Sequence, residues 1–462
     1  MSPDRAPLPA AVVQALRARF GARFSQSDAQ RLQHGKSETH HAPHLPDGVV
    51  MAHTTDEVAE VVRLCAQHRM PVIPFGAGTS VEGNFTPIHG GITLDLSEMN
   101  QVLEVNAEDF DCTVQAGVRR QQLNEHLRDK GLFFPIDPGA DATIGGMAST
   151  RASGTNAVRY GTMKDAVLSL RVVTAEGREI RTAGRARKSA AGYDLTRLFV
   201  GSEGTLGVIT EVTLRLHPIP ETISSAVCGF DSFAGAVNTV VQTIQFGIPI
   251  ARVEILDDVQ MRAVNRWSKL DYPEVTTLFF EFHGSSTYVA EQVETVAAIA
   301  ADNGGGDFRW ASSPEERSKL WKARHDAFYA ATGLRPGCIG WPTDVCVPMS
   351  RLAECIEATK ADLAKASFPA PILGHVGDGN FHVIFVIDPN NPAEIAEAEA
   401  LNDALIERAL AMDGTCTGEH GIGLGKIDCL EAELGEAVEL MRTLKRAFDP
   451  LDIMNPGKIV RL

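Results

Sequence analysis

The sequence is short of several features that mark common functional classes. Its eight cysteines form no Cys-x-x-Cys pair, which argues against a zinc ribbon or an iron–sulfur cluster and fits a reducing compartment. No run of ~18 apolar residues occurs, and no apolar stretch precedes Leu16, so neither a spanning helix nor a secretory signal is expected. Acidic residues outnumber basic residues by 59 to 43, and the resulting net charge of -16 would repel nucleic acid.

The overall composition is that of an ordinary globular protein. Hydrophobic residues make up 44% of the chain and charged residues 22%. A length of 462 residues is too great for one core and indicates two or three domains. We expect a cytoplasmic protein without a transmembrane segment, and we leave peripheral membrane attachment open.

Two short segments predict a metal site with a base beside it. Residues 372–376 and 381–387 are rich in β-formers around Gly377-Asp378-Gly379-Asn380, which predicts a hairpin with His375 opposite His382. Opposed residues have Cβ atoms ~5 Å apart, so both imidazoles could bind one ion, with Glu419 as a carboxylate ligand. An ordinary turn with two satisfied histidines is the alternative. Glu419-His420 lies between glycines, which favours the site.

A glycine loop, Gly76-Ala77-Gly78-Thr79-Ser80-Val81-Glu82-Gly83, follows a predicted strand at 71–75. Val81 breaks the Rossmann pattern and Asn84-Phe85 breaks the Walker pattern, so both common nucleotide motifs are excluded. A pyrophosphate-binding nest of backbone N–H groups remains, with a plain glycine turn as the alternative. Small residues at 138–149 and 153–161 favour a large planar or phosphorylated ligand.

Periodicity outlines the remaining elements. Helices are predicted at 233–246, 288–301, 314–331 and 430–448, and strands at 166–174, 206–216, 224–230 and 276–282. The prolines of Pro218-Ile219-Pro220 cannot continue a central strand and predict the end of a domain.

From His44-Leu45-Pro46 to Pro220 the chain resembles the flavin domain of the vanillyl-alcohol oxidase/para-cresol methylhydroxylase (PCMH) superfamily. With Gly374–His382 and Gly418–Gly423 added, it resembles the D-lactate dehydrogenase and glycolate oxidase branch of flavin-linked 2-hydroxyacid dehydrogenases. The resemblance implies an α+β fold. Its expected parts are an N-terminal helical segment (1–42), a two-subdomain PCMH-type FAD-binding domain (43–220), an α+β, ferredoxin-like substrate or cap domain with the metal site (221–425), and a C-terminal segment packing back on the FAD domain (426–462).

The resemblance also implies the residues around FAD. It assigns the diphosphate to the glycine loop and to Thr143–Ser149, and places Glu203–Ile209 along the cofactor. The expected FAD contacts are Pro74, Phe75, Gly76, Ala77, Gly78, Thr79, Ser80, Gly83, Pro138, Gly139, Ala142, Thr143, Gly145, Gly146, Ser149, Gly154, Asn156, Ala157, Glu203, Gly204, Gly207, Ile209 and Asn455. Some relatives attach FAD through a histidine in the first loop, where Thr79-Ser80 stands here, so we expect noncovalent FAD.

The expected reaction moves a hydride from a 2-hydroxyacid to the flavin. A divalent ion, zinc or manganese, on His375, His382 and Glu419 would bind the substrate, and His420 would act as general base. The alternative for His420 is a hydrogen-bonding role behind the ligands. Arg324 matches the family arginine that binds the substrate carboxylate, with an internal salt bridge or a side chain reaching solvent as its alternatives.

Trp341, Pro342 and Ile384 predict an apolar pocket, which favours D-lactate or a slightly larger apolar 2-hydroxyacid over 2-hydroxyglutarate. A glycolate oxidase flavin subunit, a D-2-hydroxyglutarate dehydrogenase and a non-catalytic flavin- or metal-binding protein remain alternatives. Without an NAD fingerprint or iron–sulfur motif, electrons must leave to oxygen or to a separate acceptor, for which the family suggests a cytochrome, a quinone or an electron-transfer flavoprotein. A homodimer is left open.

Overall fold

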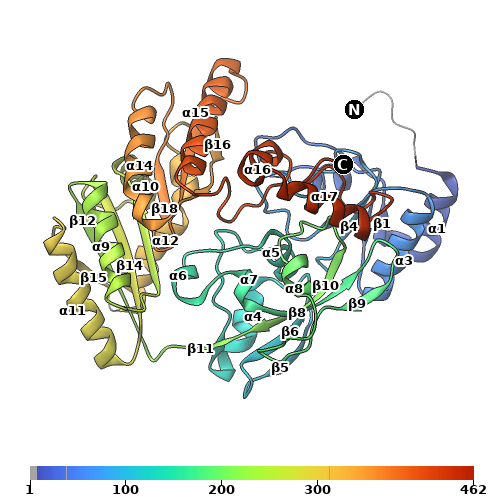
Figure 1. The fold of residues 1–462 in the computed structure, drawn as a ribbon, viewed down its shortest axis with the longest axis horizontal. Helices are drawn as coiled ribbons and strands as arrows, with labels where there is room; N and C mark the ends of the chain where they lie inside the picture. Colours follow the sequence, from blue (N-terminus) through green and yellow to red (C-terminus); the bar gives the residue numbers. More distant parts are fainter. Residues whose placement is uncertain (1–7, 38, 312) are drawn as a thin grey trace. The chain divides into compact units, whose positions relative to one another are not determined.

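The computed structural model describes residues 8–37, 39–311 and 313–462. Residues 1–7 and 38, which belong to the predicted N-terminal segment, lie outside this description. The chain divides into two compact units (Figure 1). The first unit contains Met1–Ser153, Gly161–Ile219 and Glu419–Leu462, and the second contains Gly154–Tyr160 and Pro220–Gly418. The predicted domain bounds differ from these units at 154–160, at Pro220 and at 419–425.

The described residues of the first unit form three sheets. One is mixed, with the order β1 (Phe24–Ser25), β2 (Gly48–Met51), β4 (Ile92–Asp95), β3 (Val72–Phe75), and its β2, β4 and β3 are parallel. The second is antiparallel, with the order β5 (Val102–Asn106), β6 (Asp111–Gln115), β10 (Val208–Arg215), β8 (Val167–Val173), β9 (Glu179–Arg181). The third pairs β11 (His217–Pro218) with β7 (Leu132–Phe133).

Helices fill the connections of the first unit. They are α1 (Ala10–Phe20), α2 (Asp28–Gln33), α3 (Thr55–Gln67), α4 (Arg120–Leu127), α5 (Ile144–Thr150), α7 (Met163–Ala166), α8 (Leu195–Phe199), α16 (Ile427–Leu434) and α17 (Ala437–Phe448), with short 3₁₀ turns at Gly21–Arg23 and Arg128–Lys130. Helix α3 begins after Thr54, whose side chain accepts the Glu57 amide, and its apolar stripe is buried.

The second unit is built on one eight-stranded sheet. Its order is β15 (Arg309–Ala311), β12 (Thr222–Phe230), β14 (Thr276–Gly284), β13 (Arg252–Leu256), β18 (Ile372–His375), β19 (Asn380–Ile387), β16 (Ile339–Pro342), with β17 (Val345–Cys346) also paired to β19. Helices α9 (Phe233–Gln245) and α11 (Ser286–Asp302) lie beside β12 and β14 (Figure 1). The other helices are α6 (Ala157–Tyr160), α10 (Asp258–Ser268), α12 (Pro314–His325), α13 (Ala327–Thr332), α14 (Met349–Leu363) and α15 (Pro392–Ala411). Both units mix helices with sheets, so the expected α+β class is confirmed.

One face of this sheet changes from apolar to polar along its strands. Val227, Leu256, Phe279 and Ile384 form a buried cluster with residues of α10, α12 and α13. Because side chains alternate along a strand, the residues two positions away lie on the same face. That face therefore continues into a polar set: Arg252, Glu254, Glu281, His375 and His382.

Two predicted helices are each broken in two. The helix expected at 314–331 ends at His325, and Asp326 leaves helical geometry with ψ near 2° before α13 begins. The helix expected at 430–448 is α16 followed by α17, because Gly435 has a φ of 53°. Left-handed backbone of this kind is easily adopted only by glycine and ends a helix.

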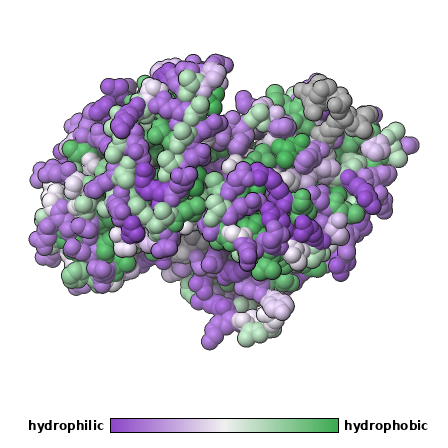
Figure 2. Space-filling model, turned by 45° about the horizontal axis from the view of Figure 1, so that its top comes forward, coloured by the Kyte–Doolittle hydropathy of each residue, from purple (hydrophilic) through white to green (hydrophobic). Residues whose placement is uncertain are grey.

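Among the described residues, no helix is long and apolar enough to cross a membrane. The face drawn in Figure 2 mixes hydrophilic and hydrophobic side chains, as the ordinary composition of the chain leads one to expect.

Candidate active-site residues

The β18–β19 hairpin carries two predicted metal ligands in a register different from the expected one. His375 lies opposite Asn380, and His382 opposite Leu373. The turn is Val376–Gly379, one residue earlier than predicted, because Asn380 joins the sheet by pairing with Cys346 of β17. Moving the turn by one residue shifts the register by two, which keeps both imidazoles on one face. Their ring centroids are 5.5 Å apart.

Hydrogen bonds define the tautomer of both histidines. His382 Nδ1 lies 2.9 Å from the backbone oxygen of Thr343, which can only accept, so Nδ1 carries the proton. His375 Nδ1 lies 2.7 Å from Glu254 Oε1. Burial alone would raise the pKa of Glu254, but His375 and Arg324 hold it below its ordinary value, so the carboxylate accepts. Each imidazole thus directs its lone pair to Nε2, the form that ligates a metal ion.

Arg324 forms an internal salt bridge. Its Nε and Nη2 donate to Glu254 Oε2 at 3.0 and 2.5 Å, and both side chains are buried. This pairing is the alternative that sequence reasoning weighed against substrate binding. Glu254 engages two of the five guanidinium N–H groups, so the pairing is compatible with a second anion.

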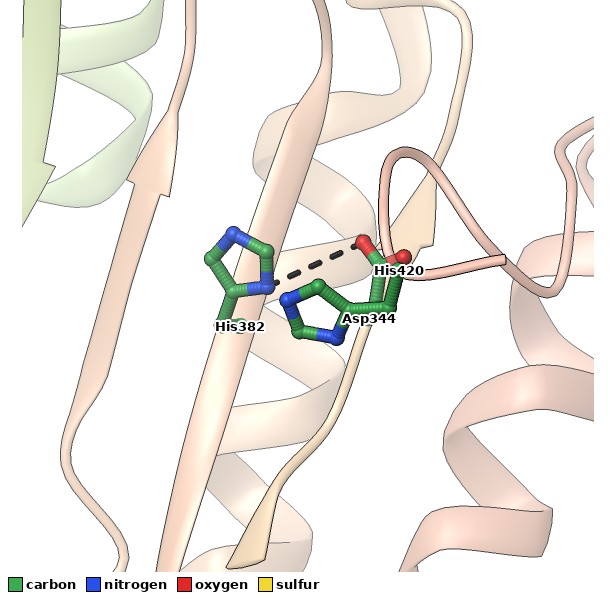
Figure 3. A group of neighbouring side chains, drawn as sticks. All are labelled: Asp344, His382 and His420. Carbon is green, nitrogen blue, oxygen red and sulfur yellow. Dashed lines mark ion pairs between the residues drawn. The ribbon is translucent and has the colours of Figure 1, made fainter. Parts of the chain in front are cut away.

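Asp344 is a buried carboxylate beside His382 that sequence reasoning did not single out. Figure 3 shows its ion pair with His382, in which Nδ1 lies 3.7 Å from Asp344 Oδ1. Asn380 Nδ2 donates to Oδ1 at 2.8 Å and Thr417 Oγ1 donates to Oδ2 at 2.6 Å. Both oxygens are therefore engaged within the second unit.

The two segments assigned to the FAD diphosphate lie together in the first unit. A Cβ built on Gly76 would be 2.3 Å from Thr143 Oγ1, at the start of α5. Gly78 and Gly83 have φ values of 70° and 69°, which residues with a side chain rarely adopt. The loop therefore needs its glycines, and its bare backbone suits the close approach of phosphate groups.

Glu203, a predicted FAD contact, uses its side chain to hold the segment that follows Glu419-His420. Its carboxylate accepts the amides of Ile422 and Gly423 at 2.7 and 2.9 Å, and Asn84 Nδ2 at 2.8 Å. Burial raises the pKa of Glu203 to about 7 against these hydrogen bonds. Asn455 donates to the backbone oxygens of Asn84 and Glu203, both at 2.7 Å. We call Asn84, Glu203 and Asn455 the loop clamp.

His420, the predicted base, has a carboxylate behind it. Its Nδ1 lies 3.8 Å from Glu82 Oε1, and Lys426 Nζ lies 3.2 Å from the same oxygen. Burial by itself would raise the pKa of Glu82, but Lys426 and His420 bring it below its ordinary value. Glu82 is thus an anion that stabilises positive charge on His420. Glu419 belongs to the same unit, with Oε1 4.0 Å from His420 Nε2.

Three predicted FAD contacts, Gly154, Asn156 and Ala157, belong to the second unit. Asn156 Oδ1 accepts from Arg252 Nε of β13 at 2.9 Å. The remaining predicted FAD contacts belong to the first unit. Sequence reasoning missed Glu254, because Arg252 and Glu254 alternate with apolar residues in strand 252–256, a pattern that usually places the charged side chains on an exposed face.

The expected apolar pocket is only partly supported by the strand register. Pro342 lies opposite Ile384, on the same face as His382, but Trp341 lies opposite Phe385 on the other face and packs against that ring. Trp341 therefore does not share the face of the two histidines.

Comparison with known families identifies the chain. The family profile "FAD linked oxidases, C-terminal domain" matches residues 219–459, and "FAD binding domain" matches residues 46–183. The chain belongs to the family of FAD-linked oxidases. The predicted superfamily and FAD as cofactor are thereby supported, and the protein is an FAD-dependent oxidoreductase.

The similarity to individual relatives extends over nearly the whole chain. It is 54% identical over 442 residues to "Probable D-lactate dehydrogenase, mitochondrial" of Danio rerio, covering 95% of this chain and 89% of that protein. It is 47% identical to "D-lactate dehydrogenase [cytochrome], mitochondrial" of Arabidopsis thaliana, covering 93% and 76%. The solved structure of p-cresol methylhydroxylase with substrate bound shares the fold, with a TM-score of 0.81, 18% identity, and 98% and 96% of the two chains covered.

The expected cytoplasmic location is wrong, because the relatives from Danio rerio and Arabidopsis thaliana are both named as mitochondrial proteins. The expectation rested on cysteine usage and on missing apolar runs. These features argue against secretion and against a spanning helix, but they do not distinguish the cytoplasm from another reducing, aqueous compartment of the cell.

Proposed function

We propose that this protein oxidises D-lactate, or a similarly small apolar D-2-hydroxyacid, to the 2-oxoacid. The observation that carries the proposal is the 54% identity, across 95% of the chain, to a protein named "Probable D-lactate dehydrogenase", together with the 47% identity to one named "D-lactate dehydrogenase [cytochrome]". FAD, held noncovalently by the glycine loop and the start of α5, supplies the acceptor for the hydride.

His420 is proposed as the general base that takes the substrate hydroxyl proton. Glu82, 3.8 Å from Nδ1, supports this role because a carboxylate behind an imidazole stabilises the imidazolium formed on proton uptake. The loop clamp supports it too, since Glu203 fixes the backbone just after His420 without using its imidazole.

His375, His382 and Glu419 are proposed as ligands of a divalent ion, zinc or manganese. The proton on Nδ1 of both histidines supports this proposal, and the part assigned to Glu419 rests on the sequence. Such an ion supplies Lewis-acid polarisation of a bound hydroxyl. Elemental analysis of protein purified without added metal should find about one ion per chain for a site of this kind. Full activity after complete chelation would refute the catalytic part.

Arg324 is proposed to hold the substrate carboxylate with the N–H groups that Glu254 does not engage. A guanidinium suits a carboxylate because it offers several donors in one plane. A cytochrome is proposed as the electron acceptor, which the name of the Arabidopsis thaliana relative supports.

Anaerobic mixing tests the proposed reaction directly. D-lactate should bleach the flavin absorbance rapidly, while L-lactate, glycolate and D-2-hydroxyglutarate should act far more slowly. Faster bleaching by glycolate would favour the glycolate oxidase alternative. Bound FAD that no 2-hydroxyacid reduces would refute the proposed function.

A further inference from the structure

Glu254 joins two predicted site residues within the second unit. Its Oε1 accepts from His375 Nδ1 at 2.7 Å, and its Oε2 accepts from Arg324 Nε and Nη2 at 3.0 and 2.5 Å. We propose that Glu254 is a positioning residue that couples divalent-ion binding at His375 to substrate-carboxylate binding at Arg324, so that each strengthens the other. The inference rests on the proposed function, because it requires an ion at the first residue and a carboxylate at the second.

The place of Glu254 in the sheet makes this bridge rigid. It lies on the central strand β13 between Val253 and Ile255, opposite Phe279 of β14, and its side chain is 0% exposed. A carboxylate without water must be held by cations and hydrogen-bond donors. Its partners come from two elements, His375 from β18 and Arg324 from α12. Because no solvent screens the buried carboxylate, a change of charge at His375 or Arg324 alters the hydrogen bond of Glu254 to the other residue.

The sign of the coupling follows from charge. An ion on His375 Nε2 makes the Nδ1–H more acidic and strengthens its hydrogen bond to Glu254. The negative charge of Glu254 is then drawn toward His375 and neutralises Arg324 less completely. Arg324 becomes a stronger partner for a second carboxylate. Because binding free energies are linked, the substrate carboxylate must strengthen ion binding by the same factor.

His382 is held differently. Its Nδ1 donates to the neutral backbone oxygen of Thr343, and Asp344 Oδ1, 3.7 Å from the same nitrogen, accepts from the neutral amide of Asn380, so this pair does not link His382 to Arg324. The coupling therefore depends on one carboxylate, and one substitution should remove it.

The chain provides a matched control in Glu281. This buried carboxylate lies on β14 opposite Arg252, on the same face as Glu254, and it too is paired with one histidine and one arginine. His283 Nε2 lies 2.8 Å and Arg252 Nε 3.5 Å from Glu281 Oε1. Glu281 and His283 have no role in the proposed reaction, and Arg252 is connected to it only through its hydrogen bond to Asn156, a predicted FAD contact. Glu281→Gln therefore matches the chemistry of Glu254→Gln away from the proposed metal ligands and Arg324.

The test measures binding rather than turnover. FAD-loaded, metal-stripped protein is titrated with pyruvate in the absence and presence of saturating Mn²⁺, and with Mn²⁺ in the absence and presence of pyruvate, by calorimetry. In the wild type, each ligand should lower the Kd of the other by the same factor, within the range of roughly 5- to 150-fold usual for coupled sites. Glu254→Gln should reduce that factor to below about twofold, while Glu281→Gln should retain it.

Three results would overturn the inference: equal coupling in Glu254→Gln and wild type, loss of coupling in Glu281→Gln as well, or a wild type that binds both ligands independently. A wild type that binds neither Mn²⁺ nor pyruvate would instead refute the proposed site. If Glu254→Gln does not fold, Glu254→Asp keeps the charge on a shorter side chain that cannot reach both partners. It should also lose the coupling, and wild-type coupling in this variant would overturn the inference.

Discussion

His420 is the residue whose replacement should separate chemistry from cofactor binding. Its imidazole faces Glu82, while the loop clamp contacts only its backbone oxygen, through Asn84 Nδ2 at 3.3 Å. His420→Ala should therefore keep FAD bound and slow flavin reduction by D-lactate ~10²- to 10⁴-fold, the usual cost of losing a general base. Stopped-flow absorbance measures this rate, with the exposed His126→Ala as control. A near-normal rate in His420→Ala would assign the base to another group.

Arg324 should show two separable effects, one on stability and one on substrate binding. Arg324→Ala leaves Glu254 as a buried, partly unpaired anion, which typically costs about 3–5 kcal/mol, and should lower Tm as well as raise KM for D-lactate. Adding Glu254→Gln removes the stranded charge, so the double variant should recover much of the Tm while KM stays high. Thermal unfolding and steady-state kinetics measure the two effects. A normal KM in the double variant would show that Arg324 does not bind the substrate carboxylate and serves only in the internal salt bridge.

At the scale of elements, the loop clamp should make stability depend on pH. Burial raises the pKa of Glu203 from 4.5 to about 7, so the folded state binds more protons than the unfolded state between these values. The stability due to Glu203 is complete below pH 4.5 and is lost as the pH rises through 7. The loss amounts to roughly 3 kcal/mol.

Glu203→Gln should remove this part of the pH dependence, because a side-chain amide does not ionise. Its one oxygen can accept from only one of the Ile422 and Gly423 amides, which Glu203 accepts with two different oxygens, so the variant should be less stable at both pH values. Denaturant unfolding of wild type and variant at about pH 5 and about pH 7.5, on either side of the raised pKa, gives the comparison. The wild type should lose more stability than the variant between the two. Equal losses in both proteins would show that Glu203 stays ionised in the folded state throughout this range.

Local patterns predicted elements well where the governing interactions are local. The hairpin at His375 and His382 was placed on the correct strands and face, but its register was wrong by two residues, since pairing with β17 decides where β19 begins. The breaks at Asp326 and Gly435 were missed because apolar periodicity continues across them. Gly435 was a readable signal, since glycine commonly ends a helix.

Interactions between distant parts of the chain were beyond sequence reasoning. Glu254 and Arg324 are 70 positions apart, and Glu203 and Ile422 are 219 apart. No spacing rule relates such residues. The segment 154–160 shows the same limit, because it continues a run of small residues along the chain but belongs to the second unit. The predicted ligand and base types could be read from motifs, whereas the carboxylates that orient them could not.

For the whole molecule, we predict that FAD is released when the protein is denatured. The glycine loop contains no histidine or cysteine to form a covalent bond, and Ser80 Oγ instead donates to Asn84 Oδ1 at 2.5 Å. Two imidazoles do lie near the loop: His420 Nδ1 is 3.8 Å from Glu82 Oε1, and a Cβ on Gly83 would be 3.2 Å from His41 Cδ2. Burial, with help from His41, lowers the pKa of the adjacent His40 to about 4, which keeps its imidazole in the neutral, nucleophilic form.

Acid precipitation tests whether FAD is covalently bound. All yellow colour should remain in the supernatant, and the wild type and a His40→Ala/His41→Ala variant should release it equally. Colour retained in the wild-type pellet but not in that variant would identify a covalent bond to one of these histidines, and the flavin attachment inferred from Thr79-Ser80 would be wrong.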